Sequence, residues 1–226
     1  MKKAPAHRGK GFQKPASRAH SRLKARAGRL ASGEVIMESA TALFLKNGYL
    51  STSMDDIAAR AGISKRTIYT HFQDKAQLFR EMVISAAKTS DRAIDAFPDI
   101  VKKNGDPKKI LKRLAHQLVA TVFRDQVIQM RRLSIMESAR FPQIAREYFR
   151  LAPQRARQAL ASVLQSLSEK GMLRIDNPTL AADHFSALVL MIPLDSAMFG
   201  ERFPLPELER RADEGIRVFL SAYARA

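Results

Sequence analysis

The stretch that decides the fold is MDDIAARAGISKRTIYTHF, residues Met54–Phe72. Its first half places apolar residues three and four apart, which predicts a short helix that ends at Gly62. Ser64 then suits the cap of a second helix, with Ile68 on its inward face. Two short helices joined by a tight glycine-containing turn are typical of a helix-turn-helix.

The second helix of such a motif enters the DNA major groove, while the first crosses the backbone. Its outward side chains can all donate hydrogen bonds and none is acidic; they are Lys65, Arg66, Thr67, Tyr69, Thr70 and His71. A face that meets only solvent normally mixes both signs of charge. We therefore expect this helix to read DNA. The alternatives are that Tyr69 only packs against its neighbours and that His71 is an inert surface histidine.

Helices are also expected on both sides of this motif. Apolar residues at helical spacing predict a helix that ends at Asn47-Gly48, where the glycine supplies a left-handed stop. Ser53, with Asp56 three residues later, forms a variant of the capping box. Asp74 suits the cap of a long fourth helix, which carries the chain out of this region.

The run Thr52–Phe72, followed by Asp74-Lys75 and Leu78-Phe79, resembles the signature of the TetR family of transcriptional regulators. The resemblance covers Val35–Phe79. The chain departs from the pattern at Arg66, where many members carry Gly, and this adds a charge near the groove. The resemblance implies a three-helix DNA-binding domain followed by a helical ligand-binding and dimerisation domain.

The resemblance also implies roles for single residues. Residues at the start of the first helix of the motif that resemble phosphate-binding positions are Thr52 and Ser53, and helix-start amides and hydroxyls suit an anion. Positions that match those clamping the DNA backbone are Tyr69, His71 and Lys75. Positions that match those facing bases are Lys65, Thr67 and Thr70, which Arg66 can join.

From residue 80 onward the sequence pattern again predicts helices. The predicted helices are Pro107–Phe123, Asp125–Ala139, Pro142–Leu151, Pro153–Glu169, Pro178–Phe199 and Pro206–Tyr223. Residues Phe97–Asp106 contain Pro, Asn and Gly, and we expect them to form the junction between domains. The segment from Arg131 to Phe149 resembles the C-terminal domain of AefR-like regulators. That resemblance implies that the last two helices pair with their copies in a second subunit.

An effector site is expected among the helices spanning 107–190. Methionine conforms to ligands of varied shape, and a histidine can orient a polar group. The candidate ligand-binding residues are His116, Met130, Met136, His184 and Met191. For each residue taken singly, a core-filling methionine or an ordinary satisfied or exposed histidine is the simpler interpretation.

The charge of the chain is concentrated at its start. The 226 residues carry a formal net charge of +17, and ten positive charges precede Leu30 with no acid among them. A segment with so few large apolar residues cannot bury enough apolar surface to offset the conformational entropy lost on folding. We therefore expect residues 1–29 to form a disordered basic arm that binds polyanions, with a solvated tail as the alternative. The rest divides into a DNA-binding domain at 30–79 and a regulatory and dimerisation domain at 80–226.

Several classes of protein are disfavoured. Cysteine is absent, which excludes disulfides and thiolate metal sites. The histidines lack paired ligand spacing, and phosphate loops, nucleophile elbows and dinucleotide glycine patterns are missing. The most apolar run, Phe185–Leu194, is interrupted by Pro193 and too short to cross a membrane. We expect no catalytic activity, cofactor, metal or membrane partner, and a cytoplasmic location, with an organelle transit peptide as the alternative for the basic start.

The sequence thus predicts an all-α protein with an N-terminal three-helix helix-turn-helix domain and a C-terminal helical ligand-binding and dimerisation domain. We expect a homodimer that binds a double-stranded DNA operator and represses until an unknown small-molecule effector releases it. The alternative is a ligand-independent DNA-binding protein dominated by its basic arm.

Overall fold

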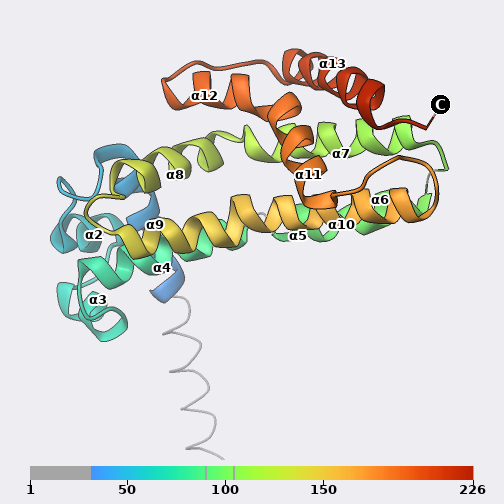
Figure 1. Ribbon diagram of the computed structural model, residues 1–226. Helices are drawn as coiled ribbons and strands as arrows, with labels where there is room; N and C mark the ends of the chain where they lie inside the picture. Colours follow the sequence, from blue (N-terminus) through green and yellow to red (C-terminus); the bar gives the residue numbers. More distant parts are fainter. Residues whose placement is uncertain (1–31, 90, 104, 226) are drawn as a thin grey trace, which may run out of the picture.

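The computed structural model describes residues 32–89, 91–103 and 105–225, and the predicted basic arm at 1–29 lies outside them. These residues form helices and connecting turns (Figure 1). In the described part of the chain the only β pairing is an isolated bridge between Leu173 and Ala224. The all-α prediction is confirmed.

The helices follow one another with short connections. In chain order they are the helix over residues 32–47, α2 (Met54–Ala61), α3 (Lys65–His71), α4 (Lys75–Lys88), α5 (Asp91–Asp95), α6 (Phe97–Lys103), α7 (Pro107–Val122), α8 (Asp125–Met136), α9 (Pro142–Phe149), the π-helical turn η1 (Arg150–Gln154), α10 (Arg155–Glu169), α11 (Pro178–Ser186), the π-helical turn η2 (Ala187–Met191), α12 (Ile192–Met198) and α13 (Leu205–Tyr223).

The N-terminal helices begin and end where the sequence places the caps. The Ser53 capping box opens α2, and Asp74 accepts the amide of Gln77 to open α4. Gly48 ends the first described helix with a φ of 78°, in the left-handed region that glycine tolerates. These caps let short helices with little intrinsic stability form where packing requires them.

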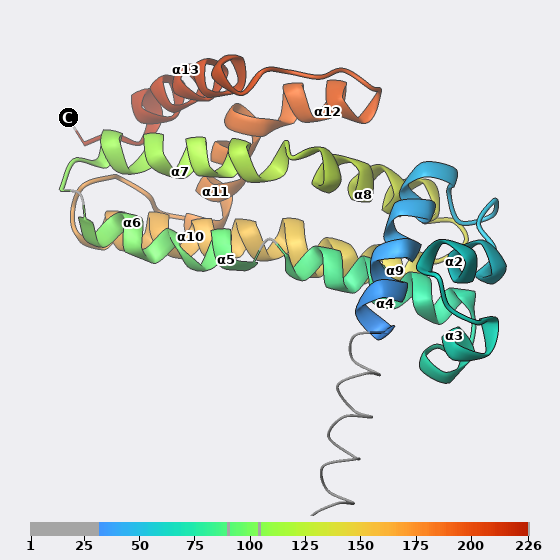
Figure 2. The same cartoon turned by 180° about the vertical axis from the view of Figure 1, so that it is seen from behind.

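The N-terminal helices and the rest of the molecule share a core. Phe44, Ile68 and Leu78 are buried in the same cluster as Met130 and Tyr148, which lie on α8 and α9. The α4 helix therefore packs on both sides, and it runs from the helix-turn-helix into the body of the protein (Figures 1 and 2).

The remaining helices form stacked layers. In both views α4, α5 and α6 lie with α9 and α10, α7 and α8 lie above them, and α12 and α13 form the outer layer. The α11 helix crosses from α10 to α13 and packs against both. The second core sits between these layers and includes Leu111, Leu164, Phe185 and Phe219. Gly215 allows α13 to approach η2, since an added Cβ would lie 2.6 Å from the carbonyl oxygen of Leu188.

Two expected helix boundaries, an end at Leu151 and a start at Pro153, are wrong. Pro142–Leu151 and Pro153–Glu169 do not form separate helices, because η1 connects α9 to α10 and contains Pro153. A π turn shifts the hydrogen-bond register, which accommodates a proline that has no amide hydrogen to donate. The predicted junction at Phe97–Asp106 is mostly α6, and Phe97 is buried in the second core. Pro98 suggests a break in the sequence, but at the second position of α6 a proline is compatible with the start of a helix.

The apolar helical segment around Phe185 is longer than the run Phe185–Leu194 that the sequence pattern indicates. From α11 through η2 to α12, Pro178–Met198 would be long and apolar enough to cross a membrane by length and composition alone. Ala181, Phe185 and Val189 of this segment are buried in the second core. Helices of a protein core pass the same test, so packing inside this fold accounts for the buried apolar residues of the segment.

Candidate DNA-binding face and regulatory cavity

The turn between α2 and α3 fixes the direction of the candidate recognition helix. Gly62 has a φ of 66°, and its amide donates to the carbonyls at the end of α2. The Ser64 side chain then accepts the amide of Thr67 and caps α3. Ile68, on the inner face of α3, is fully buried, so the opposite face of the helix points outward. This is the helix-turn-helix that the sequence predicts.

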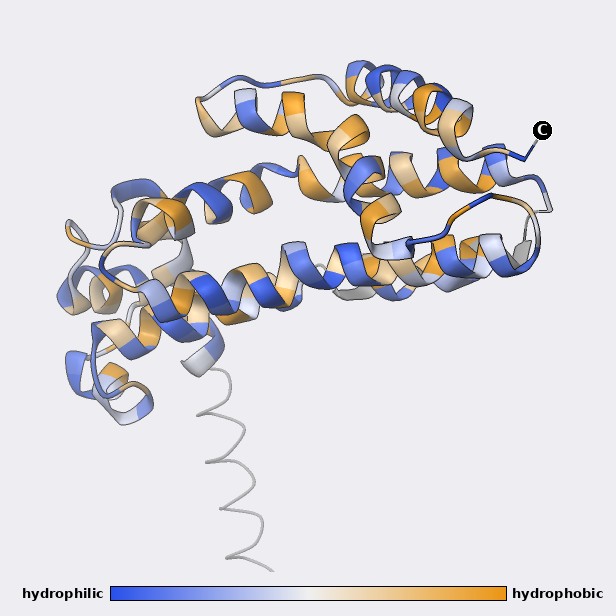
Figure 3. Cartoon of the chain, in the orientation of Figure 1, coloured by the Kyte–Doolittle hydropathy of each residue, from blue (hydrophilic) through white to orange (hydrophobic). Residues whose placement is uncertain are grey.

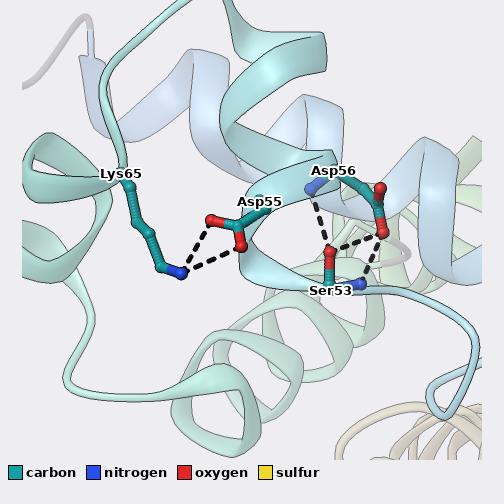
Figure 4. Close-up of polar contacts among 4 residues, drawn as sticks. All are labelled: Ser53, Asp55, Asp56 and Lys65. Carbon is teal, nitrogen blue, oxygen red and sulfur yellow. Dashed lines mark hydrogen bonds and ion pairs between the residues drawn. The ribbon is translucent and has the colours of Figure 1, made fainter.

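Ser53 forms the predicted capping box at the start of α2 (Figure 4). The Ser53 amide donates to Asp56 Oδ2 over 2.9 Å, and the Ser53 hydroxyl donates to the same oxygen over 2.6 Å. Hydrogen bonds from the Ser53 side chain and backbone hold the pKa of Asp56 below its ordinary value. Ser53 is exposed, so it stays a candidate for a phosphate contact.

Thr52 is placed differently from the phosphate contact predicted for it. The residue is 1% exposed, and its hydroxyl donates to the carbonyl of Gly48 over 2.9 Å. A buried hydroxyl that is already bonded inside the protein cannot reach a phosphate without opening the turn. Thr52 therefore serves to close the turn before α2.

Lys65 is held by an acidic residue that the sequence analysis missed. The Lys65 ammonium lies 2.8 Å from Asp55 Oδ1 and 2.9 Å from Asp55 Oδ2 (Figure 4). The side-chain hydrogen bond and the charge of Asp55 raise the pKa of Lys65. Both side chains are more than half exposed, so the ion pair is weak and can exchange for a base contact. Asp55 lies ten residues from Lys65, and only the packing of α2 against α3 brings them together.

The other predicted contacts lie on or beside the outward face of α3. Arg66, Tyr69 and Thr70 are exposed, whereas Thr67 and His71 are partly buried. The Thr70 hydroxyl donates to the carbonyl of Arg66 over 2.8 Å. The Thr67 hydroxyl lies 2.9 Å from the Ser64 hydroxyl. Arg66 and Tyr69 therefore present the largest exposed side chains on this face.

Lys75 joins the start of α4 to the turn before α2. Its ammonium donates to the carbonyls of Tyr49 and Thr52 over 2.9 and 2.8 Å, and it lies 4.3 Å from the centre of the Tyr49 ring. Two of its three donors are therefore used inside the protein. The family resemblance predicts that Lys75 clamps the DNA backbone, and the structure adds this internal role.

Two adjoining cavities lie between the helical layers of the C-terminal half. The larger has a volume of about 400 Å³, between α7, α10 and η2. The smaller, about 60 Å³, extends toward α5, α6 and α9. Their shared walls are Leu118, Val122, Arg131, Pro153 and Ala156. The larger cavity falls within the size range of ligand pockets, and its lining is mostly apolar.

The structure does not bring the five predicted ligand-binding residues together. Met191 lines the larger cavity. Met130 is buried in the first core and borders a separate pocket beside the end of α4. Met136 is exposed at the end of α8, where it faces Gly48. The His184 ring bonds to the Tyr223 hydroxyl over 2.6 Å. Sequence alone could not separate these positions, because each lies on a helix whose neighbours were unknown.

His116 belongs to a polar cluster between α7 and α13, away from both cavities. Its Nε2 lies 2.8 Å from Asp213 Oδ1, and Lys112 Nζ lies 2.7 Å from Asp213 Oδ2. Partial burial alone would raise the pKa of Asp213, but the hydrogen bonds and charges of Lys112 and His116 outweigh it and lower that pKa. His116 therefore has a structural partner in this fold.

Two polar cavity residues were not among the sequence candidates. Arg131 lines both cavities, and Tyr148 lines the smaller one. A signal was present, because Arg131 follows Val127 by one helical turn and both line the smaller cavity. A cation on the apolar side of a helix marks a candidate site, but only the fold shows that this side faces a cavity.

Known proteins with the same pattern cover both halves of the chain. Residues 36–82 match the family described as bacterial regulatory proteins, tetR family. Residues 109–225 match the AefR-like transcriptional repressor, C-terminal domain. A putative TetR-family transcriptional regulator from Mesorhizobium loti MAFF303099 is 35% identical, with a TM-score of 0.81 over 87% of this chain and 98% of that one. The chain belongs to the TetR family. The resemblance to this family and to the AefR-like domain is thereby confirmed, and the protein is a DNA-binding transcriptional regulator.

Other relatives of this TetR-family protein are less similar or match a shorter part of the chain. The flavonoid-responsive regulator FrrA is 28% identical with a TM-score of 0.68, covering 87% of this chain and 99% of that chain. The transcriptional regulator AcrR of Shigella flexneri is 35% identical over 96 residues, which is 40% of this chain and 42% of that protein. The AcrR match therefore spans less than half of either protein.

The TetR-family chain also exposes an apolar surface on its last helices. Figure 3 shows hydrophobic residues along η2 and α12. The exposed members are Leu180, Leu188, Met191, Ile192, Phe199, Leu205 and Val218. We call this set the α11–α13 face. Phe199 is 86% exposed and Ile192 is 71% exposed, which is unusual for side chains of this size.

Proposed function

We propose that the protein is a homodimeric repressor that binds a near-palindromic operator and leaves it when a small molecule occupies the cavity. The observation that carries this proposal is the position of α4. Its first residue, Lys75, contacts the turn before α2, and its last turn borders a pocket together with Tyr148, which also lines the smaller cavity. Arg80 on α4 also pairs with Glu147 on α9 over 3.0 Å.

A ligand in the cavity can act on DNA binding only through such a shared element. The ligand must bind the conformation that is released from DNA better than the bound one, because equal affinity for both shifts nothing. Tyr148 packs in the same core as α4, so displacement of Tyr148 changes the surface on which α4 rests. The name of FrrA, a flavonoid-responsive relative, supports a small-molecule effector for this chain as well.

The α11–α13 face supports the dimer. An apolar surface of this kind marks a protein interface, and one recognition helix alone buries too little surface for specific DNA binding. We expect Phe199→Ser to produce monomers in sedimentation at micromolar concentration. The matched control is Ile135→Ser, because Ile135 is an exposed apolar residue on α8, outside this face. A wild-type chain that sediments as a monomer would contradict the proposal.

On DNA, each subunit would place α3 in the major groove. We propose base contacts from Lys65, Arg66, Thr67 and Thr70, and backbone contacts from Ser53, Tyr69, His71 and Lys75. We further propose that the protein acts in the cytoplasm and has no catalytic activity of its own.

Footprinting on the DNA upstream of its own gene tests the operator. We expect a protected near-palindrome with half-sites about one helical turn, or a multiple of it, apart. Affinity for this site should exceed that for random DNA by at least about 10³-fold. Equal affinity for both DNAs would favour the second candidate, a ligand-independent binder dominated by the ten positive charges before Leu30.

A further inference from the structure

Arg131 has an unusual environment for a charged residue. It is largely buried, it lines both cavities, and burial lowers its pKa from the ordinary value. Among the described residues, no carboxylate forms an ion pair with it. Arg157, which has the same sign of charge, also lowers the pKa of Arg131. Arginine stays protonated in proteins, so the cavity wall carries a positive charge without a counterion from this part of the chain.

Tyr148 adds a second donor to the same place. It is 7% exposed, and burial raises its pKa, so the phenol is neutral near pH 7. Its hydroxyl makes no hydrogen bond to any residue that the structure describes. Tyr148 and Arg131 are close enough for the guanidinium to affect the pKa of the phenol. Buried polar groups nearly always have partners, so a pair of unsatisfied donors calls for an acceptor.

The other charged groups of the larger cavity compensate one another. Arg157 lies 3.4 Å from Asp183, and the Arg157 guanidinium also lies over the Phe149 ring. The remaining wall is apolar, with residues such as Leu160, Leu190 and Met191. The cavity therefore offers one uncompensated positive charge beside a long apolar surface.

We propose that the effector is an organic anion with an apolar body, whose carboxylate or phenolate binds Arg131 and Tyr148 while the body fills the larger cavity. This inference rests on the proposed function, since it names the chemistry of the ligand for the same cavity. A guanidinium fork bonds a planar carboxylate through two parallel hydrogen bonds, which favours this group over a point acceptor. Neither a cation nor a neutral alkane would satisfy the two donors.

A series of matched probes on the full-length protein tests the inference. Decanoate, decanamide and decylamine share one apolar chain and differ in the charge of the head group. Isothermal titration should show that decanoate binds about 10–100-fold more tightly than decanamide, as expected for a hydrogen bond to a charged group. Decylamine should bind more weakly than either.

Variants connect this preference to the two residues. Arg131→Met should lower decanoate affinity by about 10–100-fold and leave decanamide affinity nearly unchanged. Tyr148→Phe should lower decanoate affinity by about 3–10-fold. The control is Arg146→Met, which removes the same charge from an exposed position on α9. Arg131→Met without ligand should be as stable as the wild type or more stable, because it removes an uncompensated buried charge. If Arg131 instead stabilised the fold, the Arg131→Met variant would be less stable than the wild type.

Three results would overturn the inference. Decanoate could fail to bind at millimolar concentration, decanamide could bind as tightly as decanoate, or Arg131→Met could bind decanoate like the wild type. Operator binding is measured separately in the same preparations. An operator that stays bound when decanoate saturates the protein would refute release by this ligand, and it would leave the head-group preference standing.

Discussion

Lys75 is the residue whose two assigned roles, one from sequence and one from structure, can be separated most clearly. As a DNA clamp it would hold a phosphate. In the structure its ammonium donates to the carbonyls of Tyr49 and Thr52 and lies over the Tyr49 ring. Lys75→Met removes the charge and both hydrogen bonds while it keeps most of the apolar stem.

The expected loss of stability follows from these contacts. A hydrogen bond to a charged group contributes about 1.5–3 kcal/mol, and a partly exposed pair of such bonds lies toward the lower end. We therefore expect Lys75→Met to lower the free energy of unfolding by about 2–4 kcal/mol. Denaturant titration should show a lower midpoint at an unchanged slope. The matched control is Lys88→Met, at the other end of α4, which should differ from the wild type by less than about 0.5 kcal/mol.

DNA binding distinguishes the two roles of Lys75. Each phosphate contact contributes about 0.9 to the slope of log affinity against log salt, so a clamp in both subunits would contribute about 1.8. If Lys75 acts by holding the turn before α2, affinity falls for operator and random DNA alike, and the slope changes by less than one. Unchanged stability together with a slope lower by about 1.8 would refute the structural role.

Further predictions concern the DNA face, the acid sensitivity of the fold and the basic arm. Lys65→Ala should change discrimination between operator variants, whereas Tyr69→Phe should weaken binding to all sequences alike, and competition titrations with variant duplexes compare them. The pKa of Asp213 is lowered in the folded state, so its stabilising effect is complete above its ordinary value of 3.8 and disappears as the pH falls through the folded pKa. Asp213→Asn should therefore lose less stability than the wild type between about pH 5 and pH 3 in acid titrations of unfolding. Deleting residues 1–27 should flatten the salt slope by several units in the dimer without changing operator preference, and parallel salt dependences would show that the arm does not touch DNA.

The DNA-binding end could be predicted from sequence almost completely, because its signals are local. Caps such as Ser53 and Ser64 and the turn at Gly62 act within four residues of the backbone groups that they satisfy. The Lys65–Asp55 ion pair could not be predicted, because it joins two helices whose packing the sequence does not specify. Thr52 was assigned to a phosphate for the same reason, since only the fold shows that its hydroxyl points inward.

In the C-terminal half, the sequence determined that the chain forms helices, and for most of them where they begin. It could not determine which side of each helix meets a neighbour, a cavity or solvent, because that depends on residues distant in the chain. His116 bonds to Asp213, 97 residues away, and so has a partner outside the cavities. Arg131 lies at a cavity because α7, α8 and η1 converge on it. Local periodicity specifies a helix, whereas a binding site is a property of the space between helices, and only the tertiary structure defines that space.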